Sequence, residues 1–276
     1  MVSQQKIDEL RERARELRKS AVTMIYKAQS GHPGGSLSCA DIVAALYFDE
    51  LNLKPKDPKW PLRDRFILSK GHVCPIQYAA LAARGYFDKS VLDTLRREGS
   101  ILQGHPDMKK CPGIDISTGS LGQGLSVGVG MAIALKHDKT NSRVFVIVGD
   151  GEMDEGQIWE AIMTAYKYGL DNLVFILDHN GLQVDGPCDE IMPHLDMSEK
   201  MRAFGFDVFD IDGHDMGQIL ETFEKIRGMK NGRPKFINAR TIKGKGVSYM
   251  ENVVVWHGLA PNDEEYAQAM KELEEA

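Results

Sequence analysis

The chain has 276 residues, which by length alone fits one large domain or two smaller ones. Hydrophobic residues make up 42% of it, enough for a sizeable core, and the formal net charge is −6 with both signs mixed along the chain. The sequence shows no basic stripe for nucleic acid and no long apolar run for a membrane span, and its charged start argues against a secretory signal. We therefore expect a cytoplasmic protein.

The first half of the chain alternates helical patterns with Gly-rich turns. Apolar residues at helical spacing predict a long amphipathic helix over residues 5–28, which the Gly- and Pro-containing stretch 31–35 ends. Ser38, with Asp41 three residues on, resembles a capping box and predicts a helix through Leu46. The small-residue stretch 122–136 predicts a closely packed helix, since no apolar strand directly precedes it as a dinucleotide-binding turn requires.

Short apolar runs separated by helical patterns continue to the end of the chain. The predicted strands are residues 65–69, 144–148, 173–177, 206–211 and 235–239, and later helices are predicted around 216–226 and over 263–275. This alternation predicts an α/β fold, a parallel sheet with helices on both faces. Because no Pro/Gly/Ser-rich linker divides the chain, we expect a single domain over 1–276.

A strand, a helix and a second strand over residues 144–182 form one predicted βαβ unit. Asp150 follows its first strand and Asn180 its second, so both are expected at the edge where parallel strands end. A carboxylate, an amide oxygen and a backbone carbonyl such as that of Leu182 are the oxygen donors that Mg²⁺ prefers. Flanking Gly149 and Gly151 let the backbone approach a diphosphate closely. Asp-Gly after a strand is also common turn chemistry; Asn180 is what favours the metal interpretation.

The four cysteines, Cys39, Cys74, Cys111 and Cys188, are widely spaced. They form no C-x-x-C pair, which disfavours a zinc site. We expect them to be reduced thiols that act as small core residues rather than a disulfide framework.

Four histidines lie in Gly-containing turns. They are His32 in SGHPGG, His72 in SKGHV, His105 in QGHPD and His257 in VWHG. Imidazole donates and accepts hydrogen bonds near neutral pH, although any one of them could be a loop histidine bonded to a nearby carbonyl. The remaining histidines are expected at a solvated helix end (His137), in loops (His194 and His214), or beside the metal ligand to orient its loop (His179).

These motifs together resemble one enzyme family. Gly149-Asp150-Gly151 followed about thirty residues later by Asn180 resembles the thiamine diphosphate motif, and the whole chain resembles the amino-terminal, diphosphate-binding part of transketolase. The resemblance implies thiamine diphosphate with Mg²⁺, Ca²⁺ and Mn²⁺ being its expected substitutes, and transfer of a two-carbon unit between sugar phosphates. It also implies residue roles: metal ligands Asp150, Asn180 and Leu182; cofactor contacts His72, Gly119, Ser120, Leu121, Gly151, Glu152, Asn180 and His257; and catalytic histidines His32, His105 and His257 around the sugar.

The resemblance covers this chain but only the first part of the family. Transketolases continue with a pyrimidine-binding domain that activates the cofactor, so the resemblance implies a carboxyl-terminal partner subunit in an α2β2 assembly. Glu155 and Glu160 resemble the family's glutamates that link two active sites, or are simply carboxylates at a helix start. Alternatives are half of a 2-oxo acid dehydrogenase or deoxyxylulose-phosphate synthase, against which the histidine turns speak, or a non-catalytic relative.

Overall fold

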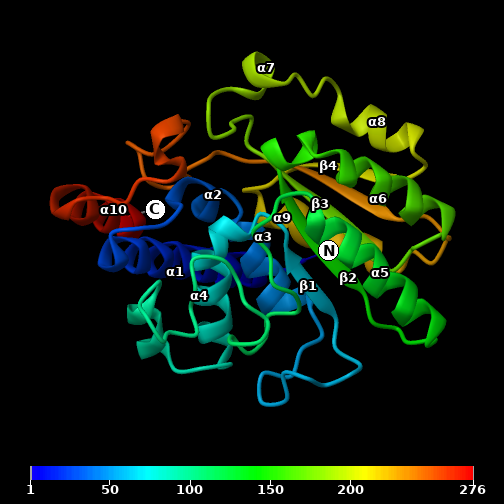
Figure 1. Cartoon of the computed structure of the whole chain (residues 1–276), viewed down its shortest axis with the longest axis horizontal. Coiled ribbons are helices and arrows are strands. Elements are labelled where there is room, and N and C mark those ends of the chain that lie inside the picture. Colours follow the sequence, from blue (N-terminus) through cyan, green and yellow to red (C-terminus); the bar gives the residue numbers. More distant parts are fainter. Residues whose placement is uncertain (1, 276) are drawn as a thin grey trace.

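One five-stranded parallel sheet organises the protein. In the computed structural model, which describes residues 2–275, the strands lie in the order β1-β2-β3-β5-β4 (Figure 1). Each end lies within two residues of its prediction, which confirms the predicted strands. Their bounds are β1 Arg65–Leu68, β2 Val144–Gly149, β3 Leu173–His179, β4 Asp207–Asp212 and β5 Lys235–Arg240.

Helices cover both faces of this sheet, as predicted. Their bounds are α1 Gln4–Ala28, α2 Pro33–Ser38, α3 Ala40–Ala45, α4 Cys74–Arg84, α5 Gln123–His137, α6 Gly156–Lys167, α7 Cys188–Ile191, α8 Met197–Ala203, α9 Met216–Arg227 and α10 Asp263–Glu275. Among residues 2–275, no helix is both long and apolar enough to cross a membrane.

Alternate side chains of each strand pack into two different cores. On β2, Phe145 and Ile147 join the core formed with α1, α3, α4 and α9. Val144, Val146 and Val148 point the other way, into the core formed with α5, α6 and α8. Burial of one such side chain contributes about 1.5–3 kcal/mol, so a sheet with both faces covered needs the near-continuous apolar runs seen in the sequence.

The segment after α1 differs from its prediction. The chain forms α2, α3 and then a π-helical turn, Leu46–Glu50, instead of one helix that starts at Ser38. Ser38 ends α2, and its hydroxyl donates to Asp178 on β3 rather than capping a helix. The predicted capping box is wrong because the Ser38 hydroxyl donates to the distant Asp178 carboxylate instead of bonding the backbone at a helix start.

A small third core fixes the position of His257. Trp256, Val22 and Leu273 pack together where α10 lies against α1, visible at the left of Figure 1. The short turn Val254–His257 contacts α2 there. His257 is thereby held near His32, although the two residues lie toward opposite ends of the chain.

Candidate active site

A cavity of about 340 Å³ lies at the carboxyl edge of the sheet. Segments that follow β1, β2, β3 and β5 form its wall, together with α2 and the turn before α10. The lining residues are His32, Gly35, Lys70, His72, Gly119, Leu121, Gly149, Asp150, Gly151, Glu152, Asn180, Leu182, Gln183, Val184, Lys243 and His257. The structure therefore gathers most of the predicted site residues around one cavity.

Asp150 is the most informative residue of this cavity. It is 2% exposed, and its Oδ2 accepts hydrogen bonds from the backbone amides of Asn180 (2.7 Å) and Gly181 (2.9 Å). Asp150 and Asn180 therefore lie side by side, as predicted from the βαβ pattern. Its other oxygen, Oδ1, is buried without a hydrogen-bond partner, and burial raises the pKa of the carboxyl group. A buried, unpartnered carboxylate oxygen fits a cation ligand, since leaving it unpaired is costly.

The other two predicted metal ligands lie on the same rim. The Asn180 side chain accepts from the Leu182 amide (3.2 Å) and donates to Asp178 (3.3 Å). Asn180 and Leu182 both line the cavity with Asp150. The residues present fit a divalent cation, and their assignment as its ligands stays a prediction.

A buried ion pair behind the cavity was not predicted from the sequence. Lys70, directly after β1, pairs with Asp178 near the end of β3, and both side chains are almost fully buried. Burial alone would lower the pKa of Lys70, but Asp178 keeps that pKa above its ordinary value. Lys70 therefore stays protonated at the cavity wall, where it shares its charge with Asp178.

A second cation, Lys243, also escaped the sequence analysis. Its Nζ lies 3.2 Å from the Gln183 carbonyl oxygen and 3.0 Å from Nδ1 of His257. Burial and the nearby Lys70 charge lower the pKa of Lys243 to about 8. Lys70 and Lys243 line the same cavity as the Asp150 carboxylate. A diphosphate fits such a cavity, because the two lysines and a cation bound to Asp150 would balance its negative charge. Its place soon after the last strand was the available signal.

Three of the predicted histidines form a triangle in the cavity. Ring centroids are 5.0 Å apart for His32 and His72, 5.5 Å for His32 and His257, and 5.1 Å for His72 and His257. They come from the start of α2, the turn after β1 and the turn before α10. The three histidines lie in separate sequence motifs, and the fold brings them together.

Two predicted residues lie outside the cavity lining. His105 and Ser120 are both exposed. The His105 ring packs against Gly119, where an added Cβ would lie 3.0 Å from the ring. His105 is thus placed next to the cavity rather than within its wall.

Glu152 ties the loops around the cavity together. Its carboxylate accepts from the Ser69 hydroxyl and from the backbone amides of Gly122 (2.9 Å) and Gly149 (3.4 Å). Gly122 has a φ of +81°, which favours glycine, and an added Cβ would lie 2.7 Å from that of Glu155. Glu152 therefore holds three loops in register, and its predicted contact with the cofactor stays a prediction.

The remaining acidic and histidine predictions have mixed surroundings. Glu155 and Glu160 are exposed in the single chain, so their role in linking sites stays a prediction. His137 is exposed at the end of α5, as expected. His214 lies in a loop, and its Nδ1 pairs with Asp41 at 2.8 Å. His194 also lies in a loop, but it is buried.

The histidine triangle makes stability depend on pH. Burial, with added repulsion from Arg96 and Lys243 respectively, lowers the pKa of His32 and His257 from 6.5 to about 4. Between pH 6.5 and pH 4 the unfolded chain binds more protons at these histidines than the folded chain does. The free energy of unfolding therefore has its full value above about pH 6.5 and falls as the pH decreases toward 4. We expect urea unfolding to show a loss of about 1 kcal/mol per histidine from pH 7 to pH 5, after a discount for partial exposure.

A His32→Gln, His257→Gln double variant should lose less stability over the same interval. Asp41, whose pKa is lowered to about 2 by Arg18 and His214 against the effect of burial, titrates below this window. Equal stability of the unaltered chain at pH 7 and pH 5 would contradict the expectation.

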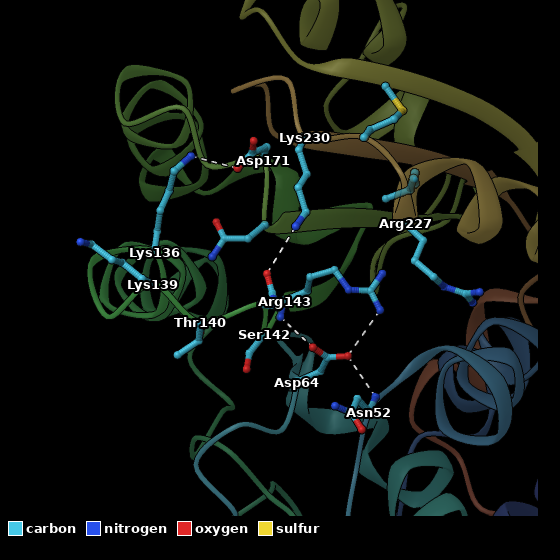
Figure 2. A pocket seen from close by; sticks show the side chains of 14 residues that line it. Asn52, Asp64, Lys136, Lys139, Thr140, Ser142, Arg143, Asp171, Arg227 and Lys230 are labelled. Atoms are coloured by element: carbon cyan, nitrogen blue, oxygen red, sulfur yellow. Dashed lines mark hydrogen bonds and ion pairs between the residues drawn. The ribbon is translucent and has the colours of Figure 1, made fainter.

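A second cavity, of about 430 Å³, lies at the opposite, amino-terminal edge of the sheet. Figure 2 shows two of its basic side chains paired with carboxylates, Arg143 with Asp64 and Lys136 with Asp171, the latter at 2.9 Å. None of the predicted site residues lies there. Lys136, Arg143 and Arg227 there are each paired with a carboxylate, and the carboxyl edge is the better candidate site.

The fold and the site define an α/β protein with a diphosphate-type cavity where parallel strands end. Residues 10–274 match the family described as transketolase, thiamine diphosphate binding domain. The chain belongs to this transketolase family.

Similar proteins include both short subunits and longer chains. The sequence is 47% identical to an apulose-4-phosphate transketolase subunit of Phocaeicola vulgatus, covering 94% of this chain and 91% of that protein. It is 46% identical to the 6-deoxy-6-sulfo-D-fructose transketolase subunit SqwG of a Clostridium species, covering 99% and 98%. Identity to human transketolase is 41%, over 92% of this chain and 40% of that protein.

Solved structures give the same picture. Transketolase from Leishmania mexicana superposes with a TM-score of 0.91 at 30% identity, covering 99% of this chain and 42% of that one. Transketolase from Campylobacter jejuni gives 0.91 at 32%, covering 97% and 43%. The chain thus spans about two fifths of the length of these solved transketolases.

Proposed function

We propose that this chain is the amino-terminal, cofactor-binding subunit of a two-subunit transketolase. It transfers a two-carbon ketol unit from a ketose phosphate to an aldose acceptor in the cytoplasm, and residues 1–276 form a single diphosphate-binding domain. The observation that carries the proposal is the histidine triangle sharing one cavity with the unpartnered carboxylate oxygen of Asp150. The two subunit relatives, similar over nearly their whole length, support the split arrangement.

Asp150, Asn180 and the Leu182 carbonyl on the rim of the cavity would hold Mg²⁺, and through it thiamine diphosphate. Lys70 and Lys243 balance the remaining negative charge of the diphosphate. When bound, this cofactor supplies carbanion chemistry at the sugar carbonyl, and the protein supplies orientation and electrostatics. Gly119 and Leu121 lie on the cavity wall, where the cofactor ring is expected.

The surroundings of two histidines fix which nitrogen carries the proton. Lys243 donates to Nδ1 of His257 (3.0 Å), and Arg96 lies 3.5 Å from Nδ1 of His32. Because lysine and arginine are donors only, each Nδ1 is the acceptor and each Nε2 keeps its hydrogen. Both rings are neutral near pH 7. In this proposal their Nε2–H groups donate to sugar oxygens that gain negative charge, His32 in exchange for its hydrogen bond to the backbone of His72.

A partner subunit completes this site. Val184 lines the cavity yet is 57% exposed, and Val255 and Leu259 are exposed next to His257. Apolar side chains around a polar cavity are typical of a surface that another chain covers. We propose that a carboxyl-terminal transketolase subunit covers it in an α2β2 assembly and supplies contacts to the sugar phosphate.

The proposal is tested with the two purified subunits together. The candidate partner is the product of a neighbouring reading frame that resembles the remaining transketolase domains. The mixture should transfer a two-carbon unit from xylulose 5-phosphate to ribose 5-phosphate, and neither subunit should do so by itself. Consumption of pyruvate instead would favour a different thiamine diphosphate enzyme, and failure of the pair to bind the cofactor with Mg²⁺ would favour a non-catalytic relative.

Replacing His32 with alanine separates turnover from cofactor binding. His32 donates to the sugar in this proposal and contacts no predicted metal ligand, so kcat should fall about 100-fold while thiamine diphosphate affinity changes little. His137→Ala, at the exposed end of α5, serves as the matched control. If titration of the cofactor shows His32→Ala as impaired in binding as in turnover, the assigned role is wrong.

A further inference from the structure

A group of nitrogen, sulfur and oxygen donors joins Asp150 to two residues that do not line the cavity. The carboxylate of Asp150, the thiol of Cys188 and the imidazole of His194 are all buried, and one donor atom from each lies within 4.8 Å of the others. They come from the end of β2, from α7 and from the loop before α8. The three residues come from separate segments, so no short sequence motif predicts the group. The absence of a C-x-x-C pair therefore does not exclude it. Residues 2–275 contain no second group of this kind.

Two histidines point a free nitrogen at the unpartnered oxygen of Asp150. Its Oδ1 lies 4.0 Å from Nδ1 of His194 and 3.9 Å from Nε2 of His179. The opposite nitrogen of each ring is already bonded, His194 Nε2 to Asp154 and His179 Nδ1 to Asn238, both at 2.8 Å. Since these partners accept, each ring donates there and keeps a lone pair toward Asp150. Metal-binding histidines are oriented in this way.

We propose that Asp150, Cys188 and His194, with His179 as the fourth ligand, form a binding site for Zn²⁺. Thiolate and imidazole donors favour zinc over magnesium, which prefers oxygen alone. A tetrahedral zinc ion holds its ligand atoms about 3.3–3.8 Å apart. The donor atoms of Asp150, Cys188 and His194, which lie within 4.8 Å of one another, therefore close by about 1 Å through side-chain rotation, and His179 turns toward them from its place 3.9 Å from Oδ1 of Asp150. The thiol loses its proton to solvent as the Zn–S bond forms.

The site bears on the cofactor through Asp150. Oδ1 is the oxygen proposed for Mg²⁺, so zinc bound to it excludes magnesium and weakens thiamine diphosphate binding. This consequence rests on the proposed function, whereas the zinc site itself stands on its four side chains alone.

Cobalt reports directly on the thiolate ligand. The metal-free full chain, titrated with Co²⁺ without cofactor, should develop near-ultraviolet absorption from a cobalt–thiolate bond, which one equivalent of Zn²⁺ removes. Cys188→Ser should abolish that absorption and weaken zinc affinity about 100-fold or more, beyond what loss of an outer hydrogen-bond partner costs. Cys111→Ser, a buried thiol in the core with α4, should keep both.

A histidine variant and a folding control complete the experiment. His194→Gln, which leaves every cysteine in place, should also weaken zinc binding, and circular dichroism checks that each variant folds. Absence of the thiolate absorption in the unaltered chain, or its persistence in Cys188→Ser, overturns the proposal. If zinc binds as expected but leaves the Mg²⁺-dependent binding of thiamine diphosphate to the two-subunit enzyme unchanged, the zinc site stands and the shared role of Asp150 fails.

Discussion

Asp150→Ala abolishes the magnesium-dependent retention of thiamine diphosphate. The substitution removes the buried, unpartnered Oδ1 that the cavity offers to a cation, while Lys70 and Lys243 remain. A diphosphate without its bridging cation loses most of its anchoring charge. In calorimetric titration of the two-subunit enzyme with Mg²⁺ as the sole metal, we expect the Kd for the cofactor to rise at least about 100-fold, or about 2.7 kcal/mol.

A second variant separates loss of the ligand from loss of the fold. Asp150→Asn keeps an oxygen that accepts from the Asn180 and Gly181 amides but removes the charge. It should unfold no more easily than the unaltered chain and should still lose the cofactor. Asp189→Ala, an exposed carboxylate on α7, is the matched control and should bind normally. Normal cofactor binding by both Asp150 variants would contradict the assignment of Asp150 as a magnesium ligand.

The part of the site that the sequence predicts depends on local patterns. Apolar runs bounded by turn residues predict β2 and β3, and parallel strands end at one edge, which places Asp150 beside Asn180. The same reasoning places His72, in the segment after β1, at that edge. These positions follow from the order of elements, without any knowledge of side-chain contacts.

The part that it misses depends on partners far apart in the chain. Lys70 and Asp178 are separated by 108 residues, and nothing near either residue shows that they pair. The role of Lys243 likewise depends on its contact with His257, which the sequence around Lys243 does not predict. Ser38 illustrates the reverse error, because a local capping pattern was overridden by its bond to Asp178.

Asp178→Ala destabilises the chain by about 3–5 kcal/mol. The Asp178 carboxylate is fully buried and accepts from Lys70, from the Ser38 and Thr241 hydroxyls, and from the side-chain amide of Asn180. Burial alone would raise its pKa, but Lys70 and these donors hold the pKa below its ordinary value. Removing it leaves a buried lysine without a counter-charge, which is the costly half of a broken ion pair. Urea unfolding of the full chain at pH 7 measures the change.

The reciprocal variants test whether the pair serves stability or the cavity. Lys70→Met leaves the carboxylate with three donors, so it should cost less than Asp178→Ala. A Lys70→Met, Asp178→Leu double variant should regain much of the stability, since apolar side chains often replace a buried pair without loss. Diphosphate affinity should not recover with it, because the cavity wall has lost a permanent cation. An Asp178→Ala chain within about 1 kcal/mol of the unaltered one, or a double variant that binds cofactor normally, would contradict this account.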